Sequence, residues 1–315
     1  MLAILCFHRV LPSNRRQTND EPYFIRQTAM ELDNFRRLLD QLQQSCEPLP
    51  PDQLVPWFEG RRSHSRPASL LTFDDGYEDV FEHAFPELES RGLKAILAVT
   101  TAVISGELAG FPVDHWYALL MEARRHGRLL TGAAPERWTL NPGEDSDFHR
   151  LIDGPEKRAF LNLSGAQQAA ILNDLRASAN LPPSAGLPSF IRLSQLQALV
   201  DAGWRLASHG HTHALLPTLA EAQAREELTL SRDWFSALGF GAPELLAWPD
   251  GKMNESTARL AGSSGYRLGL GLGGRLATRQ DSPWQLARLI PRNSSSWFED
   301  RLQPLFQTAH AELNP

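Results

Sequence analysis

The stretch Leu70-Leu71-Thr72-Phe73-Asp74-Asp75-Gly76-Tyr77 joins a short apolar run to two adjacent carboxylates and a glycine. The apolar run is typical of a buried strand, and the glycine indicates a sharp turn directly after it. Two like charges side by side raise each other's pKa and cost stability unless something neutralises them. The pair Asp74–Asp75 therefore requires a partner elsewhere in the chain.

A cluster of histidines provides such a partner. Three of the ten histidines lie in Ser208-His209-Gly210-His211-Thr212-His213, directly after the apolar stretch 204–207. Two imidazoles and one carboxylate make a catalytic metal site with positions left open for water and substrate. One aspartate would then bind the cation while the other works as a base on a metal-activated water. The alternatives are a loop of solvated histidines and, for Asp-Asp-Gly alone, a turn or a helix cap.

Short apolar runs alternate with amphipathic stretches along the chain, which is typical of βα units. We expect strands at residues 2–7, 70–73, 94–100, 204–207, 245–248, 266–270 and 284–290. Ser194 is expected to cap one helix, and Thr218-Leu219-Ala220-Glu221 to form a capping box for another. Six or seven such units predict a parallel barrel or an open parallel sheet, with the working groups where strands end.

The alternation breaks between residues 105 and 189, where amphipathic pieces are joined by segments rich in Gly, Pro and Ser. We expect residues 1–315 to form a single catalytic domain with a mostly helical insertion at 105–189 that forms no sheet. Trp116 and Trp138 lie in this insertion and would line a groove or, in the favoured interpretation, pack in a core. The insertion is also where we expect substrate specificity to be determined.

Bulk composition excludes several classes of protein. The chain has 315 residues, 42% hydrophobic and 22% charged, with a formal net charge of -6 and no basic cluster, which argues against a nucleic-acid partner. Residues 1–10 lack the features of a secretory signal, and no window approaches the roughly 18 apolar residues of a membrane span. These features favour a cytoplasmic location. Of the two cysteines, Cys6 lies in an apolar run and is expected to be a small buried hydrophobe.

Two of these motifs resemble those of a known family. The stretch Thr72 to Tyr77 and the stretch Ser208 to His213 are similar to the first two motifs of the polysaccharide deacetylases, carbohydrate esterase family 4. Residues 193–204 also resemble the helix and strand that precede the second motif in that family. The resemblance covers roughly residues 1–101 and 190–292. It implies a distorted (β/α)7-type barrel, with the helical insertion outside the resemblance.

The resemblance also implies roles for individual residues. Asp74 would be the general base, and Asp75, His209 and His213 would bind one divalent metal ion. Zinc is the first expectation for that ion, with cobalt, nickel, iron or manganese as alternatives. His211 lies between two ligands and receives no role.

The third family motif is matched by Trp248-Pro249-Asp250-Gly251, where a backbone N–H helps to hold the oxyanion. Asp250 stands where an aromatic residue is commoner, which affects the expected substrate more than the expected reaction. The alternative for this stretch is a plain turn.

The general acid and a base-orienting residue are implied by two further matches. The stretch Leu5-Cys6-Phe7-His8-Arg9-Val10 resembles the start of a family branch with permuted motif order, which includes the poly-N-acetylglucosamine deacetylases. There His8 would protonate the leaving amine, the alternative being a merely buried histidine. Arg288 matches a late Arg-hydrophobic-Pro pattern and would orient Asp74 or, alternatively, form a surface salt bridge.

Together these features predict a metal-dependent hydrolase that removes an N-acyl group, above all N-acetyl, from an amino sugar. A cytoplasmic location favours a sugar nucleotide or a lipid-linked glycan as the carbohydrate substrate. Two alternatives stay open: a catalytically silent glycan-binding or scaffold protein on the same fold, and an amidase acting on a non-sugar amide.

Overall fold

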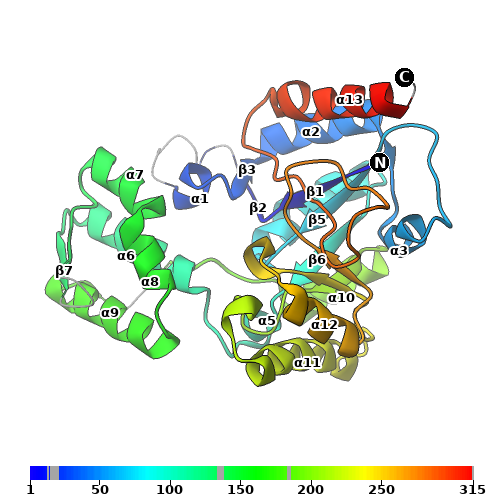
Figure 1. Cartoon of the computed structure of the whole chain (residues 1–315). Helices are drawn as coiled ribbons and strands as arrows, with labels where there is room; N and C mark the ends of the chain where they lie inside the picture. The colour runs from blue at the N-terminus through cyan, green and yellow to red at the C-terminus, as the bar shows by residue number, and fades with distance from the viewer. Residues whose placement is uncertain (13, 15–20, 133–137, 183–185, 314–315) are drawn as a thin grey trace. The chain divides into compact units, whose positions relative to one another are not determined.

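The computed structural model describes residues 1–12, 14, 21–132, 138–182 and 186–313, with side chains up to residue 308 (Figure 1). The chain divides into two compact units. Unit 1 comprises Met1–Ser13, Thr28–Glu107 and Phe190–Pro315, and unit 2 comprises Asn14–Gln27 and Leu108–Ser189. In the described ranges, none of the helices combines the length and the apolar character that a membrane crossing requires.

Unit 1 is built on a seven-stranded parallel sheet. Its path runs through β1 (Leu2–Phe7), β5 (Ala68–Phe73), β6 (Ala95–Val99), β9 (Arg205–Ser208), β10 (Leu245–Ala247) and β11 (Leu268–Leu270), and β4 (Glu47–Pro48) pairs with β5 beside this path. The first two strands pair in parallel from Leu2↔Ala68 to Phe7↔Phe73. Every residue of β1 and β5 is buried, as expected for a parallel sheet covered on both faces.

The segment 284–290 connects the two edges of this sheet. Leu286 exchanges backbone hydrogen bonds with Gly269 and Gly271, and Leu289 does so with Ile4 and Cys6. The expected strand at 284–290 is therefore corrected to isolated parallel bridges, because the segment changes partner between residues 286 and 289 and neither ladder becomes long. The curled parallel sheet confirms the predicted distorted barrel.

Helices cover the outer face of the sheet, as the βα pattern predicts. Those of unit 1 are α2 (Leu32–Ser45), α3 (Leu54–Phe58), α4 (Phe85–Ser90), α5 (Thr101–Ser105), α10 (Leu193–Asp201), α11 (Glu221–Ala237), α12 (Glu255–Ser263) and α13 (Gln303–Leu313). One-turn π-helical segments precede α4 and α13, at Val80–Ala84 and Phe298–Leu302. A short parallel pair, β2 (Arg9–Leu11) and β3 (Ala29–Glu31), follows the end of β1.

Two predicted helix caps are wrong. Ser194 lies inside α10, whose N-cap is Arg192. Thr218 ends a 3₁₀ turn, Leu216–Thr218, and its hydroxyl donates to the carbonyl of Leu215. The chain makes that extra turn before α11, so the helix begins three residues after the predicted cap.

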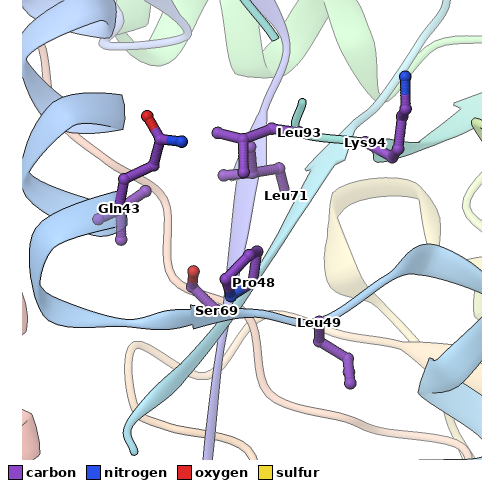
Figure 2. A pocket seen from close by; sticks show the side chains of 8 residues that line it. Gln43, Pro48, Leu49, Ser69, Leu71, Leu93 and Lys94 are labelled. Atoms are coloured by element: carbon purple, nitrogen blue, oxygen red, sulfur yellow. The ribbon is translucent and has the colours of Figure 1, made fainter. Parts of the chain in front are cut away.

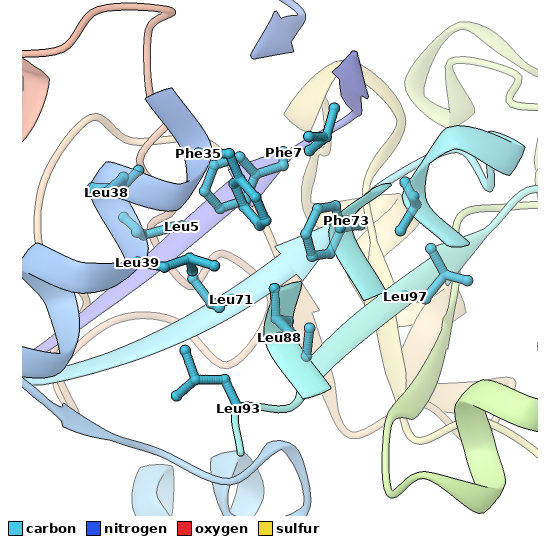
Figure 3. Packing of buried hydrophobic residues seen from close by; sticks show 14 of the residues in the cluster. Leu5, Phe7, Phe35, Leu38, Leu39, Leu71, Phe73, Leu88, Leu93 and Leu97 are labelled. Carbon is cyan, nitrogen blue, oxygen red and sulfur yellow. The ribbon is translucent and has the colours of Figure 1, made fainter. Parts of the chain in front are cut away.

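The strands separate two apolar clusters because alternate residues point to opposite faces. Leu5, Phe7, Leu71 and Phe73 pack outward with Phe35 of α2, as Figure 3 shows. The ring of Phe7 lies 5.3 Å from the rings of both Phe35 and Phe73. The intervening residues, such as Leu2, Ile4 and Leu70, form the inner cluster, so Cys6 shares the inner face of β1 with Leu2 and Ile4.

Unit 2 is mainly helical and has its own core. Its elements are α1 (Pro22–Ile25), α6 (Pro112–Arg125), α7 (Asp145–Asp153), α8 (Pro155–Leu161), α9 (Gly165–Ser178) and the antiparallel pair β7 (Leu130–Gly132) and β8 (Trp138–Leu140). The Trp116 ring stacks on Phe160 at 5.1 Å and meets Trp138 edge-on at 5.7 Å. Core packing of both tryptophans is thereby confirmed. The expectation of no sheet is wrong, because two three-residue strands pair there.

A small hollow lies at the amino-terminal end of β5 and β6 (Figure 2). Its lining residues are Leu42, Gln43, Pro48, Leu49, Ser69, Leu71, Leu93 and Lys94. Ser69 is the second residue of β5 and Lys94 directly precedes β6, whereas Asp74 follows the last residue of β5. The hollow therefore lies at the opposite end of the strands from the acidic pair.

Candidate metal centre and active site

The carboxyl ends of β1, β5 and β9 bring the chemically unusual residues to the same end of the sheet. Asp74 follows β5, and its N–H donates to the carbonyl of Phe7 at 2.9 Å. The N–H of His209 donates to the carbonyl of Val99, the last residue of β6, at 2.8 Å. These bonds continue the parallel ladder by one residue, so the side chains after β1, β5 and β9 emerge together.

Three of these side chains present ligand atoms at metal-binding distances. The Asp75 Oδ1 atom lies 3.4 Å from His209 Nε2 and 3.6 Å from His213 Nε2. Tetrahedral ligands at about 2.0–2.2 Å from a zinc ion lie about 3.3–3.6 Å from one another. The distances between Asp75 and the two histidines therefore fit a divalent metal ion.

The tautomer of His209 also fits a metal ligand. Its Nδ1 lies 2.8 Å from the carbonyl oxygen of Ala247, and a carbonyl only accepts, so Nδ1 carries the proton. The lone pair is then on Nε2, the atom that faces Asp75. Burial alone would raise the pKa of Asp75, but the neighbouring imidazoles hold that pKa below its usual value. The carboxylate is thus kept in its ligating form.

Backbone strain is concentrated at this end of the sheet. Among the described residues, five that are not glycine have positive φ, and three of them are Asp75 (77°), His213 (65°) and Asp250 (53°). Non-glycine residues in the left-handed region cost free energy and cluster at functional sites. The strain at Asp75 presents its carboxylate to the two imidazoles directly after the strand ends.

Arg288 holds the second carboxylate of the pair. Its Nη1 donates to Asp74 Oδ1 and its Nη2 to Asp74 Oδ2, both at 2.7 Å. The guanidinium is fixed in turn by the carbonyl of Gly271 at 3.0 Å and the hydroxyl of Thr72 at 3.2 Å. Burial would raise the pKa of Asp74, but the charge of Arg288 lowers it well below the usual range. Arg288 is 1% exposed, so its contact with Asp74 is not a surface salt bridge.

His8 lies beside the same carboxylate. One ligand atom each from Cys6, His8 and Asp74 lies within 4.8 Å of the others, and Cys6 Sγ is 3.4 Å from Asp74 Oδ2. The Nδ1 atom of His8 is buried and has no hydrogen-bond partner within the described chain. The ring is only half-buried, so part of it is accessible to solvent.

The third motif forms a turn beside the histidine loop. Pro249–Gly251 is a 3₁₀ turn in which Asp250 is exposed, and the Asp250 charge acts on the imidazole of His213. A Cβ at Gly251 would lie 2.8 Å from Leu272 Cγ, so the turn admits only glycine there. The Trp248 indole packs in the core and donates to the carbonyl of Trp284, and Trp248 therefore places the turn through its backbone.

Two acidic residues that the sequence analysis left out hold this arrangement. Glu227 of α11 accepts from the N–H groups of His211 and Thr212, at 3.0 and 2.9 Å, and from the Thr212 hydroxyl. Asp79 accepts from Arg9 Nε at 2.8 Å and from the N–H of Val10 at 3.0 Å, directly after His8. Neither carries a sequence signal, since a single acid on a helix or in a turn is common.

His211 bonds to residues of another segment and fixes the loop on that side. Its Nδ1 lies 2.9 Å from the Thr101 hydroxyl, and its Nε2 lies 3.2 Å from Glu107 Oε2. Both partners lie at or just after α5. His211 therefore links the histidine loop to α5.

Comparison with known proteins gives a family match for one part of the chain. Residues 166–269, which include the second and third motifs, match the family model described as polysaccharide deacetylase. No curated protein gives a match to the sequence. Over these residues the match agrees with the predicted resemblance to the polysaccharide deacetylases.

Solved structures share the fold over almost the whole chain. The Streptococcus pyogenes deacetylase PplD, in complex with acetate, is 16% identical with a TM-score of 0.64, covering 96% of this chain and 97% of that chain. IcaB from Ammonifex degensii is 18% identical with a TM-score of 0.61, covering 97% of each chain. The deacetylase domain of BpsB from Bordetella bronchiseptica is 17% identical with a TM-score of 0.54, covering 92% of this chain and 95% of that one. The family supports an enzyme that acts on carbohydrate amides.

Proposed function

We propose that this protein is a metal-dependent hydrolase that removes an N-acyl group, above all N-acetyl, from an amino sugar in a glycan, glycolipid or sugar-nucleotide intermediate. One observation carries the proposal. The Asp75 Oδ1 atom lies 3.4 Å from His209 Nε2 and 3.6 Å from His213 Nε2, next to a second carboxylate that a buried arginine holds in place. A ligand set of this kind beside a fixed base is the arrangement that amide hydrolysis needs.

The metal would be held by Asp75, His209 and His213. A divalent ion bound there supplies a Lewis acid for the amide carbonyl and lowers the pKa of a water molecule from about 15.7 towards about 7. Asp74 accepts the proton of the attacking water. Its carboxylate is suited to this because Arg288 keeps it ionised and fixes its orientation through two hydrogen bonds.

The leaving nitrogen needs a proton when its bond to the acyl carbon breaks. His8 supplies it, because its imidazole lies beside Asp74 and its ring is only half-buried. The backbone N–H of Asp250 donates to the oxygen of the acyl group as negative charge develops there. The products are a carboxylic acid and a free amine.

The deciding experiment is the replacement of the base. Asp74→Asn removes the proton acceptor and leaves all three proposed metal ligands, so turnover should fall by about 10²- to 10⁴-fold with unchanged metal content. Acetate release from a panel of N-acetylated sugars and sugar nucleotides measures turnover, and elemental analysis measures the metal. Asp75→Asn is the matched control, since it should lose both metal and activity. Full activity in Asp74→Asn would exclude the mechanism.

Metal analysis also separates the alternatives. A catalytically silent glycan-binding protein would need no metal, so the absence of stoichiometric metal, with no activation by added zinc or cobalt, would favour that function. A metal-loaded protein that cleaves only amides without a sugar would favour the amidase.

A further inference from the structure

Cys6 has no part in the proposed reaction, yet its thiol lies against the proposed base. The side chain is fully buried on the inner face of β1, and its Sγ donates to Asp74 Oδ2 at 3.4 Å. His8, two residues further along, brings an imidazole nitrogen to within 4.8 Å of Cys6 Sγ and of a carboxylate oxygen of Asp74. The Nδ1 of His8 is buried and unpartnered within the described residues. Sulfur, nitrogen and oxygen donors thus converge on one point beside the proposed metal triad.

We propose that Cys6, His8 and Asp74 form a second metal site, which takes a thiophilic divalent cation such as zinc or cadmium and inhibits the enzyme when it fills. Thiolate, imidazole and carboxylate are all zinc ligands, and a thiolate selects soft cations over magnesium or calcium. Three protein donors leave the fourth position of a tetrahedral cation for a water molecule.

Metal binding at this site replaces one proton. The S–H bond of Cys6 breaks, a bond from sulfur to the metal forms, and the proton leaves to the buffer. The hydrogen that Sγ donates to Asp74 Oδ2 occupies the lone pair that the cation then uses. No oxidant or reductant is involved. Each cation therefore takes the place of the thiol hydrogen between Cys6 and Asp74.

The consequence for activity rests on the proposed function, whereas the binding itself does not. A cation held by Asp74 and His8 occupies the lone pairs of both the proposed base and the proposed acid. Arg288, bonded to both oxygens of Asp74, opposes a further positive charge there. The second site is therefore weaker than the triad Asp75–His209–His213 and fills after it.

Cadmium titration tests the binding directly. Protein that holds one equivalent of Zn²⁺ is titrated with Cd²⁺, while the ultraviolet charge-transfer absorption of a cadmium–thiolate bond and the content of both metals are measured. The wild type should take up one equivalent of Cd²⁺ with the thiolate band while it retains its zinc. Cys6→Ser and Cys6→Ala should show no thiolate band and should bind Cd²⁺ at this site at least about 100-fold more weakly. Residues that only hydrogen-bond to a metal ligand already contribute about 10- to 100-fold to metal affinity, and a direct ligand contributes at least as much. Cys46→Ser, which removes the other buried cysteine, should behave like the wild type.

The outcomes separate this proposal from the proposed function. A missing band in the wild type, a band that persists in Cys6→Ser, or a band lost in Cys46→Ser would overturn the second site. If the band forms as expected, excess Zn²⁺ should inhibit acetate release by the wild type and by Cys46→Ser but not by Cys6→Ala, each compared with its own activity at one equivalent. Binding without inhibition would retain the site and overturn the roles of Asp74 and His8 instead.

Discussion

At the scale of single residues, the pair Asp74–Arg288 has two consequences that can be measured separately. Both side chains are almost fully buried, so each charge depends on the other for compensation. Removing one partner of a buried ion pair leaves an uncompensated charge, which costs more than the pair contributes. The same contact fixes the direction of the Asp74 carboxylate, so Arg288 is a positioning residue for the proposed reaction.

Arg288→Met should lower the free energy of unfolding by about 3–5 kcal/mol, because it leaves the Asp74 carboxylate buried and unpaired. Urea unfolding measures this loss. The double variant Arg288→Met with Asp74→Asn should recover a large part of the stability, since the uncompensated charge is gone. If the double variant is no more stable than Arg288→Met, the loss comes from packing and not from the charge.

Arg288→Lys separates position from charge. The ammonium group keeps the positive charge but cannot donate to both carboxylate oxygens in one plane. A displacement of the base by about 1 Å costs about 100-fold in rate, so kcat should fall by this order while KM changes little. An equal effect on kcat and KM would contradict a positioning role, as would a lysine variant with the full activity of the wild type.

The sequence could predict those site residues that are neighbours in a motif. Asp74 and Asp75 stand next to each other, and His209 and His213 share one loop, so their chemistry is visible before any fold is known. Asp79 and Glu227 could not be predicted, because their partners lie 69 and 15 residues away and depend on which elements meet. The thiol of Cys6 was expected to be inert, and its contact with Asp74 follows only from the register of β1 against β5.

At the scale of elements, the histidine loop is held by the helix that follows it. His213 adopts the left-handed conformation at a cost in free energy, so contacts elsewhere must stabilise the loop. Glu227 of α11 provides three of them, from His211 N–H, Thr212 N–H and the Thr212 hydroxyl. The helix thereby positions two proposed metal ligands that it does not itself carry.

Glu227→Gln should weaken zinc binding by about 10- to 100-fold, as expected for a residue that orients ligands, with little loss of helix stability. A competition titration against a chromophoric chelator measures the affinity. Glu226→Gln is the matched control, because Glu226 is the neighbouring residue on α11 and is exposed. Equal zinc affinities of the two variants would exclude a role of Glu227 in the loop.

The predicted elements succeeded where apolar periodicity was strong. The runs at residues 2–7, 70–73 and 94–100 all form strands within two residues of the expected bounds. The segment 284–290 is also mostly apolar but pairs with two partners in turn, and no local pattern reveals such a change. Thr218 does not cap α11 because a 3₁₀ turn ends at this residue. The turn depends on the path of the preceding loop, which the four residues of the predicted capping box do not reveal.

At the scale of the whole molecule, the order of apolar runs along the chain predicts the barrel. It does not predict which segments of the chain make up unit 2. Residues 14–27 belong to unit 2 although about 80 residues separate them from its remainder. Tyr23 donates to the buried Asp114 carboxylate within that unit, and Asp114 also accepts from the N–H of Phe111. A contact between such distant residues has no local signal, so an insertion limited to residues 105–189 was all that periodicity could indicate.

All three proposed metal ligands lie in unit 1, which predicts that damage to the core of unit 2 leaves metal binding intact. Trp116→Ala removes a fully buried ring and should cost unit 2 about 3–5 kcal/mol. Calorimetric titration with Zn²⁺ should give the wild-type affinity, while limited proteolysis should cut within residues 108–189 faster than in the wild type.

Phe35→Ala is the counterpart in unit 1, where the ring packs against Phe7 and Phe73, the last residues of β1 and β5. That variant should weaken zinc binding, because it loosens the strand ends that carry His8 and Asp74–Asp75. If both variants weaken zinc binding equally, the metal site depends on unit 2 as well, and the assignment of the site to unit 1 alone is wrong.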